Sequence, residues 1–226
     1  RTCINVTGDM AGTAIIASKV VYAWTLTQTV NSINYCTTGS TGHFANTSTS
    51  IFPGLASNLL LENFVFETKT SIYIPTAGPW TFGVNSDEGF RLELTGQTDT
   101  FSAEFNGLRT PADTLTTFDI PAPGMYRLRL VHFQKSAGAA VELFAAPAAA
   151  GDSDGWQSWG ETTAWRLVGE RGGLGTSLSN VATVTTYLAN VPVTSLDEAQ
   201  RVVDDVTRQV SAVTEYRNTI NLAKET

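Results

Sequence analysis

The strongest constraint on the fold is a period-two alternation of apolar with polar side chains between residues 63 and 146. The alternation returns in four runs, which begin at Phe64, Trp80, Phe90 and Tyr126. Side chains two residues apart share one face of a strand, so each run predicts a half-buried antiparallel strand. The sequence therefore predicts a mainly β body.

An internal echo supports this prediction. Residues 74–80 (IPTAGPW) follow the same design as residues 120–126 (IPAPGMY). In each segment Ile-Pro ends a strand, because proline has no N–H to donate to a ladder, and an aromatic residue opens the returning strand after a glycine turn. Two hairpins of one design predict an antiparallel β-sandwich, with two sheets that face each other.

Composition sets the class of protein. The 226 residues suit one large β domain, or one domain with an appendage. With 42% hydrophobic and 15% charged residues, the chain can bury a real core. A net charge of −7 argues against nucleic acid or an anionic membrane as the main partner. No segment has the length and apolarity of a membrane-spanning helix.

Two cysteines, Cys3 and Cys36, bear on the compartment. Their even number, the few charges and the many Thr, Ser, Gly and Asn residues favour an oxidising, extracellular environment. A Cys3–Cys36 disulfide would tie the N-terminal arm to the core and contribute roughly 3–4 kcal/mol. The alternative is two reduced, buried thiols.

We expect three parts along the chain. Residues 1–36 form an N-terminal strand arm, residues 37–170 form the sandwich with a long loop at 37–58, and residues 171–226 form a linker and an extension. In the extension, Ser195 and Glu198 fit a helix capping box. The helix is expected to end near residue 209, and residues 210–222 return to strand-like composition. The extension is therefore predicted to be strand–helix–strand.

The predicted helix carries an apolar stripe that has to be buried. The candidate assembly residues are Leu196, Val202, Val203 and Val206 on this stripe, and Ile220 in the strand that follows. The stripe can fold back on the chain's own sandwich or dock on a neighbouring unit. Residues 219–222 (TINL) also echo residues 32–35 (SINY), which suggests strand donation between units arranged head to tail.

An acidic turn interrupts the strands at residues 84–94 (VNSDEGFRLEL). Asp87 and Glu88 are adjacent, and adjacent carboxylates repel each other unless a cation such as Ca²⁺ lies between them. The alternative is a solvated turn whose charges face water. The pair is the candidate metal site.

Residues 80–92 (WTFGVNSDEGFRL) resemble the centre of PA14-type β-sandwich domains. Residues 124–133 and 140–144 resemble the later strands of that domain, and residues 109–115 resemble the connecting stretch of a bacterial extracellular subgroup. The resemblance covers about residues 33–169. In the same subgroup, a strand–helix–strand segment precedes the strand that opens the sandwich, so the tail of this chain looks like the start of another unit.

The resemblance also implies a ligand. In sugar-binding members of the family, two adjacent aspartates joined by a cis peptide hold a Ca²⁺ that binds sugar hydroxyls. Asp87 and Glu88 stand at those positions, with Glu departing from the usual second aspartate. The candidate ligand-binding residues beside them are Asn85, Arg91, Arg109 and Asp113. Arg91 and Arg109 can instead pair with the acidic turn and hold it rigid without a metal.

Trp156 and Trp159 are further candidates for ligand binding. They flank a Gly-rich loop, where aromatic rings can stack on sugar faces, although both can instead cover a sheet edge or pack on a partner. Catalysis has little support. The sequence has no G-x-S-x-G nucleophile motif, paired catalytic carboxylates normally come from separate strands, and His132 has the pattern of a half-buried strand residue.

The sequence therefore predicts a secreted, non-enzymatic surface module for adhesion or extracellular assembly. Head-to-tail self-association or tandem repeats would link such modules into a filament, with a second copy or a neighbouring repeat as partner. The alternative is a Ca²⁺-dependent carbohydrate-binding domain with a glycan as partner.

Overall fold

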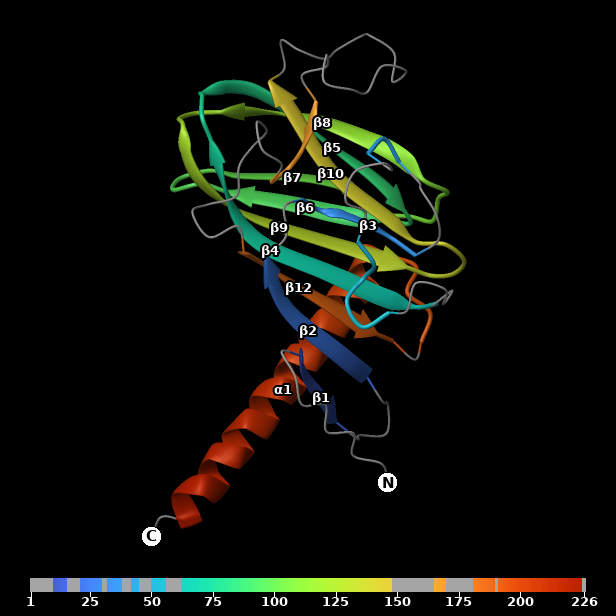
Figure 1. Cartoon of the computed structure of the whole chain (residues 1–226), viewed down its shortest axis with the longest axis vertical. Coiled ribbons are helices and arrows are strands. Elements are labelled where there is room, and N and C mark those ends of the chain that lie inside the picture. The colour runs from blue at the N-terminus through green and yellow to red at the C-terminus, as the bar shows by residue number, and fades with distance from the viewer. Residues whose placement is uncertain are drawn as a thin grey trace.

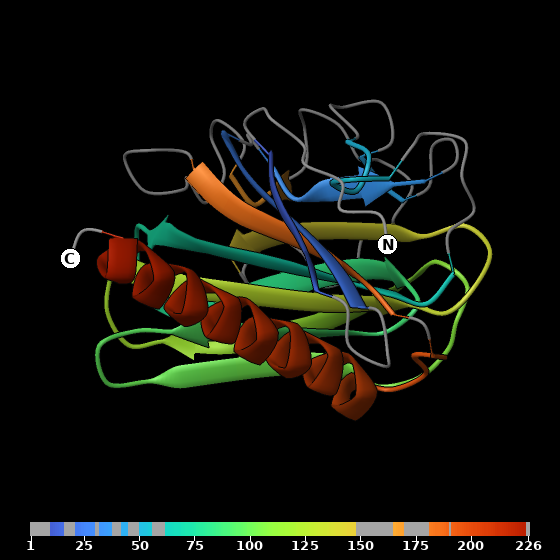
Figure 2. The same cartoon turned by 90° about the horizontal axis from the view of Figure 1, so that it is seen from below.

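In a computed structural model, two antiparallel sheets pack face to face and one long helix crosses the outer side of the larger sheet (Figures 1 and 2). The structure describes residues 10–15, 21–29, 32–37, 42–44, 50–55, 62–147, 165–169, 181–189 and 191–224. All strand pairs within this part of the chain are antiparallel. The expected fold class, a mainly β antiparallel sandwich, is confirmed.

The larger sheet has seven strands. Their order is β1 (Met10–Ile15), β2 (Val21–Thr29), β12 (Val181–Leu188), β4 (Phe64–Ile74), β9 (Gly124–Gln134), β6 (Phe90–Thr95) and β7 (Thr100–Phe105). The smaller sheet has the order β11 (Arg166–Leu167), β10 (Ala140–Pro147), β5 (Gly78–Asp87) and β8 (Ala112–Ile120), and β3 (Asn34–Cys36) also pairs with β10. Strands from the predicted arm and from the predicted tail therefore share sheets with the central strands.

The alternation in the sequence sets the core. Alternate side chains of β4, β9, β5 and β10 point into the space between the sheets, where Phe66, Phe82, Leu130 and Leu143 are fully buried or nearly so. Each such side chain contributes about 1.5–3 kcal/mol through burial. The sandwich is thus held together by the residues that predicted its strands.

The two echo segments are not hairpins, as the sequence suggested, but crossovers between the sheets. Residues 74–80 lead from β4 to β5, and residues 120–126 lead from β8 to β9. In both, the aromatic residue donates back to a turn carbonyl: Trp80 Nε1 to Thr76 O at 3.1 Å, and Tyr126 Oη to Ala122 O at 2.8 Å. The repeated sequence therefore specifies the turn and the hydrogen bond from the aromatic side chain that closes it. It does not specify which sheet the next strand joins.

The C-terminal extension also differs from the prediction. A single helix, α1 (Leu196–Lys224), continues through residues 210–222, which were expected to form a strand. The capping box is confirmed, because Glu198 N donates to Ser195 Oγ at 3.3 Å while the Glu198 carboxylate accepts from Thr194 N at 2.7 Å. Asn106 Oδ1 accepts from Leu196 N at 2.8 Å, so a loop of the sandwich also caps α1.

The apolar stripe of α1 folds back on its own sheet. We call residues 196–206 the docked segment and residues 207–224 the projecting segment. In the docked segment, Leu196, Val202, Val203 and Val206 are buried, so these four predicted assembly residues serve intramolecular packing instead. They pack with a patch of the sheet that includes Val65, Val131, Phe133 and Tyr187.

The projecting segment extends beyond the sandwich (Figure 1). Ile220 lies in it, in helix rather than in the expected strand, and its side chain is outside the described residues. Strand donation by residues 219–222 is therefore wrong for this structure. Within the described residues, no helix combines the length and apolarity that a membrane crossing needs.

Several predictions concern residues outside the described part of the chain. Cys36 is buried in β3, but Cys3 lies outside the described residues, so their pairing stays a prediction. Trp156 and Trp159 also lie outside. The expected boundaries near residues 36 and 170 stay predictions as well.

Candidate binding site at one end of the sandwich

Three crossovers between the sheets meet at one end of the sandwich. They follow β5, β7 and β9, and they carry the Asp87–Glu88 turn, Arg109 and Lys135, respectively. The strand register brings them together. Asp87 lies opposite Ala140 at the start of β10, and Ser86 lies opposite Ala112 at the start of β8. The acidic turn is therefore part of a crossover from the smaller sheet to the larger one.

The acidic turn itself is tightly packed. The Asp87–Glu88 peptide bond is cis, and Ser86 Oγ donates to the Glu88 carbonyl at 2.6 Å. Gly89 follows because a Cβ at this position would overlap the Phe133 ring and approach the Phe105 carbonyl oxygen to 2.7 Å. Glycine is thus required by close approach of a neighbouring strand.

Arg109 braces this turn from the neighbouring crossover. Its backbone N donates to Glu88 Oε2 at 3.0 Å, and its guanidinium donates to Ser86 O at 3.1 Å and to Ser86 Oγ at 2.7 Å. The guanidinium also lies 4.2 Å from the centroid of the Phe105 ring, in cation–π contact. One of the two alternatives for Arg109, pairing with the turn, is therefore seen directly.

The two carboxylates of the turn have different surroundings. Burial and the neighbouring Glu88 charge raise the pKa of Asp87 to about 6, and the positive charge of Arg109 partly offsets them. Burial also raises the pKa of Glu88, while the Arg109 N–H and the Lys135 charge oppose that rise. Glu88 is committed to backbone donors of residues 109, 135 and 136. The Asp87 carboxylate accepts no hydrogen bond from the described residues.

A polar row lies beside the turn on the outer face of the smaller sheet. Glu142, Asn85 and Asp113 are cross-strand neighbours on β10, β5 and β8. Asn85 Nδ2 donates to Asp113 Oδ1 at 2.7 Å, and Asn85 Oδ1 is buried with no hydrogen-bond partner among the described residues. Asn85 and Asp113, two predicted ligand-binding residues, are thus in direct contact.

The short segment 42–44 covers this row. Glu142 accepts from His43 N at 2.8 Å and from Phe44 N at 3.2 Å, and His43 Nε2 lies 2.9 Å from Asp113 Oδ2. Gly42 has φ +96°, a conformation that side chains rarely adopt. A Cβ at this position would also overlap the Glu142 carboxyl group, so both the backbone and the available space require glycine. Burial raises the pKa of Glu142, and the two N–H groups oppose this rise.

Sequence reasoning singled out neither Glu142 nor His43 as a site residue. A signal for Glu142 was present, because it is the only charged residue in the apolar run 139–146. No local sequence pattern indicates that His43 is its partner, since the two residues are 99 positions apart. His132 is buried completely, not by half. Its Nδ1 lies 3.1 Å from Gly89 O, and burial lowers its pKa to about 3, so it is neutral.

Arg91 is not part of the site. It lies on β6 and forms an ion pair with Glu104 of β7 at 2.8 Å, so the expectation that it pairs with the acidic turn is wrong. The alternation of side chains along a strand explains why Arg91 does not reach the acidic turn. In β6, the residues flanking Arg91, Phe90 and Leu92, face the core, so Arg91 points to the outer face of the larger sheet.

The oxygen atoms available to a cation can be counted from these contacts. Ca²⁺ takes about 6–8 oxygen ligands. The Glu88 carboxylate already accepts hydrogen bonds from peptide N–H groups. Among the oxygens of Asn85, Asp87 and Glu88, this leaves the Asp87 carboxylate and Asn85 Oδ1 without a hydrogen-bond donor in the described residues. Among the described residues, no group of three or more His, Cys, Asp or Glu side chains is arranged to hold a metal ion. This part of the chain does not by itself provide a full set of calcium ligands.

Comparison with known proteins gives structural matches only. No protein-family model matches the chain, and no curated protein sequence matches it. Among solved structures, the chain is similar to a PA14 sugar-binding domain from an RTX adhesin, with 20% identity, a TM-score of 0.37, and coverage of 54% of this chain and 69% of that chain.

Two further matches are of the same kind. The PA14 domain of the antifreeze protein MpAFP shares 15% identity at a TM-score of 0.38, covering 67% of this chain and 73% of that one. The Epithelial Adhesin 6 A domain from Candida glabrata, in complex with Galb1-3GlcNAc, shares 14% identity at a TM-score of 0.36, covering 65% and 70%. At these identities and TM-scores the matches assign no ligand or partner to this chain.

Proposed function

We propose that this PA14-like β-sandwich is a non-enzymatic, extracellular surface module for adhesion or assembly, and that it assembles through the projecting segment of α1. The observation that carries the proposal is the exposure of that segment's apolar side chains. Val210, Val213 and Tyr216 are exposed by 36%, 40% and 69%, although they continue the helix whose docked segment is buried.

The apolar stripe has the spacing of a helix–helix interface. Its positions alternate by three and four residues through Leu196, Ala199, Val203, Val206, Val210, Val213, Arg217 and Ile220. A heptad stripe of this kind packs against a second helix, and a polar residue such as Arg217 within it can fix register. The docked segment packs its part of the stripe against the sheet, and the exposed Val210 and Val213 of the projecting segment would pack against a second copy.

The low helix propensity of the projecting segment also supports packing against a second copy. The projecting segment contains six β-branched residues, which lower the stability of an isolated helix: Thr207, Val210, Val213, Thr214, Thr219 and Ile220. Most helical stability in proteins comes from packing of an apolar face. A second copy packed on Val210 and Val213 would supply that packing.

Sedimentation velocity tests this proposal. We expect the wild-type chain to self-associate as its concentration rises, and the double variant Val210→Asp/Val213→Asp to stay monomeric, because two carboxylates would be desolvated at the interface. The matched control is Ser211→Asp/Asn218→Asp, which adds the same charge to the same segment away from the stripe. A monomeric wild type, or equal loss of association in both double variants, would contradict the proposal.

A second candidate function is Ca²⁺-dependent carbohydrate binding at the acidic turn. It is favoured by Asp87, whose carboxylate has a raised pKa and no hydrogen-bond donor among the described residues, and by the buried Asn85 Oδ1 two residues earlier, which also has no hydrogen-bond partner among them. These two side chains would hold the ion. A glycan array run with and without chelator tests it. Binding that chelator and Asp87→Asn both abolish would support a lectin, and binding insensitive to both would exclude this site.

A further inference from the structure

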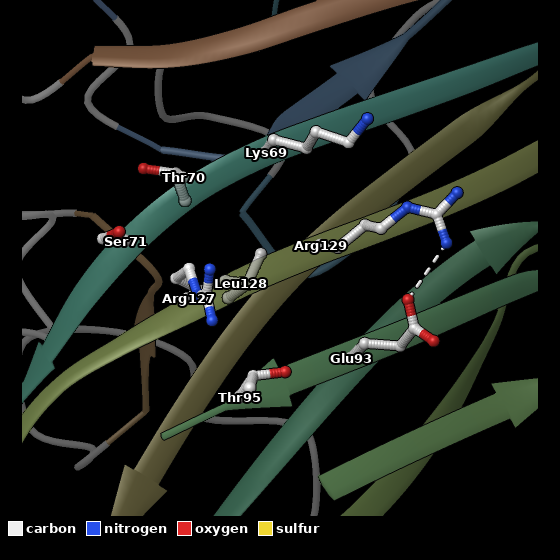
Figure 3. Close-up of a pocket in the computed structure, with 8 residues that line it drawn as sticks. All are labelled: Lys69, Thr70, Ser71, Glu93, Thr95, Arg127, Leu128 and Arg129. Atoms are coloured by element: carbon white, nitrogen blue, oxygen red, sulfur yellow. Dashed lines mark hydrogen bonds and ion pairs between the residues drawn. The ribbon is translucent and has the colours of Figure 1, made fainter. Parts of the chain in front are cut away.

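A shallow groove lies on the outer face of the larger sheet, away from the acidic turn. Its volume is about 430 Å³, and its outward-facing lining residues on β4, β9 and β6 include Lys69, Ser71, Glu93, Thr95, Arg127 and Arg129 (Figure 3). Three of these six side chains are cationic. Such a concentration of positive charge is unexpected in a chain of net charge −7.

Two of the cations are fixed by internal partners. Arg129 donates to Glu67 at 2.7 Å, to Glu93 at 3.0 Å and to Gln200 of α1 at 2.9 Å. Lys69 donates to Glu67 at 2.8 Å. Glu67 is almost fully buried, so the ion-pair network holds this wall of the groove in one arrangement.

Arg127 is different. Its cross-strand neighbours are Ser71 on β4 and Thr95 on β6, which carry hydroxyl groups and no charge. No described residue forms an ion pair or a side-chain hydrogen bond with its guanidinium. A guanidinium has five N–H donors in a planar fork. The two carboxylates in the network, Glu67 and Glu93, are paired with Lys69 and Arg129, so the unbalanced positive charge of the groove is that of Arg127.

We propose that this groove binds an acidic saccharide, with the sugar carboxylate on the Arg127 guanidinium. A planar carboxylate matches the fork of an arginine through two parallel hydrogen bonds. The flanking Ser71 and Thr95 hydroxyls can exchange hydrogen bonds with sugar hydroxyls. The Lys69 ammonium, whose side chain is 58% exposed, provides further donors at the same wall.

An apolar surface continues the groove along the strands. Tyr73 and Met125 are the next cross-strand pair on the same face, and they are exposed by 49% and 47%. An aromatic ring beside hydroxyl and guanidinium donors is the arrangement that a pyranose ring needs, because its C–H face can lie on the ring while its oxygens reach the donors. A simple anion would not use this surface.

Isothermal titration with trigalacturonate, a carboxylated trisaccharide, tests the proposal on the full chain. We expect binding that Arg127→Ala weakens at least tenfold, through loss of charge-assisted hydrogen bonds, and that Arg127→Lys only partly restores. Tyr73→Ala should weaken binding severalfold. Arg208→Ala is the matched control, since it removes the same charge from an exposed site on α1 and should leave binding unchanged.

Three further probes make the result decisive. Neutral galactotriose, hexaglutamate and inorganic sulfate should each bind at least tenfold more weakly than trigalacturonate. The proposal is overturned by absence of trigalacturonate binding, by equal losses in Arg127→Ala and Arg208→Ala, or by hexaglutamate or sulfate binding as tightly as the saccharide. Because this groove is separate from the acidic turn, chelator should not affect the titration.

Discussion

At the scale of single residues, Arg109 shows how one side chain holds an acidic turn. It ties Ser86 and Glu88 of one crossover to the crossover that follows β7, and its guanidinium rests on Phe105. The turn therefore has an internal positive charge. This arrangement explains how two adjacent acids can persist at the end of a strand.

Removal of this brace should destabilise the sandwich. We expect Arg109→Ala to lower the free energy of unfolding by about 2 kcal/mol, because partly buried acceptors on Ser86 lose charge-assisted donors. Arg91→Ala is the control. It removes an arginine from a surface ion pair with Glu104 and should cost less than about 1 kcal/mol. Urea denaturation of the two variants measures the difference, and equal losses would contradict the role assigned to Arg109.

The pH dependence of stability tests Asp87. Its pKa is raised from 3.8 to about 6 in the folded chain, so the folded state holds this proton to higher pH than the unfolded state does. Ionisation of Asp87 therefore reduces stability as the pH rises from about 4 to above 6. In metal-free buffer, Asp87→Asn should stabilise the fold at pH 7.5 by about 1 kcal/mol, allowing for solvent screening of a half-exposed group.

The same variant should give much less stabilisation at pH 4, where the wild-type carboxyl is largely protonated in the folded state and about half protonated in the unfolded state. Asp119→Asn, on exposed β8 surface, controls for the change in net charge. Thermal unfolding of both variants across this pH range measures the effect. A gain for Asp87→Asn that is the same at pH 4 and pH 7.5 would show that Asp87 is not responsible.

At the scale of elements, α1 has two environments along one helix. Val203 of the docked segment is 4% exposed, and Val213 of the projecting segment is 40% exposed. In monomeric protein we expect Val203→Ala to cost about 2 kcal/mol, through lost burial and a residual cavity, and Val213→Ala to cost less than 0.5 kcal/mol, about the scale of a surface change. Chemical denaturation at low concentration compares the two. Similar costs would show that the docked segment is not a core element.

Local patterns predicted the strands but not all of their connections. Alternation at Phe64, Trp80, Phe90 and Tyr126 marks a strand whichever sheet it joins, so period two identified the strands and left the crossovers looking like hairpins. The capping box located the start of α1. Its end was missed because residues 210–222 are rich in β-branched residues, and the packed first turns of the helix outweigh that weak preference.

The candidate site was predictable only in part, for a related reason. Asp87, Glu88, Asn85, Arg109 and Asp113 lie on or next to one sequence motif and its connecting stretch, and the fold brings them to one end of the sandwich. His43 and Glu142 meet across 99 residues, which no local pattern encodes. Arg91 was assigned to the turn from its nearness in sequence, but strand alternation turns it to another face.

At the scale of the whole molecule, the arm, the sandwich and the tail form one continuous pair of sheets, with α1 docked on one side and extended beyond it (Figure 2). The sandwich forms the body of the molecule, and the projecting segment carries the exposed apolar side chains Val210, Val213 and Tyr216. On this basis we propose assembly through the helix and ligand binding by the sandwich.

Hydrogen–deuterium exchange as a function of protein concentration tests this assignment most directly. Amides in residues 207–224 should exchange quickly in dilute protein, since Val210, Val213 and Tyr216 of this segment are exposed, and should become protected as concentration rises. Residues 196–206 should be protected at every concentration, because the sheet covers them. Exchange in residues 207–224 that does not change with concentration would contradict assembly through the projecting segment.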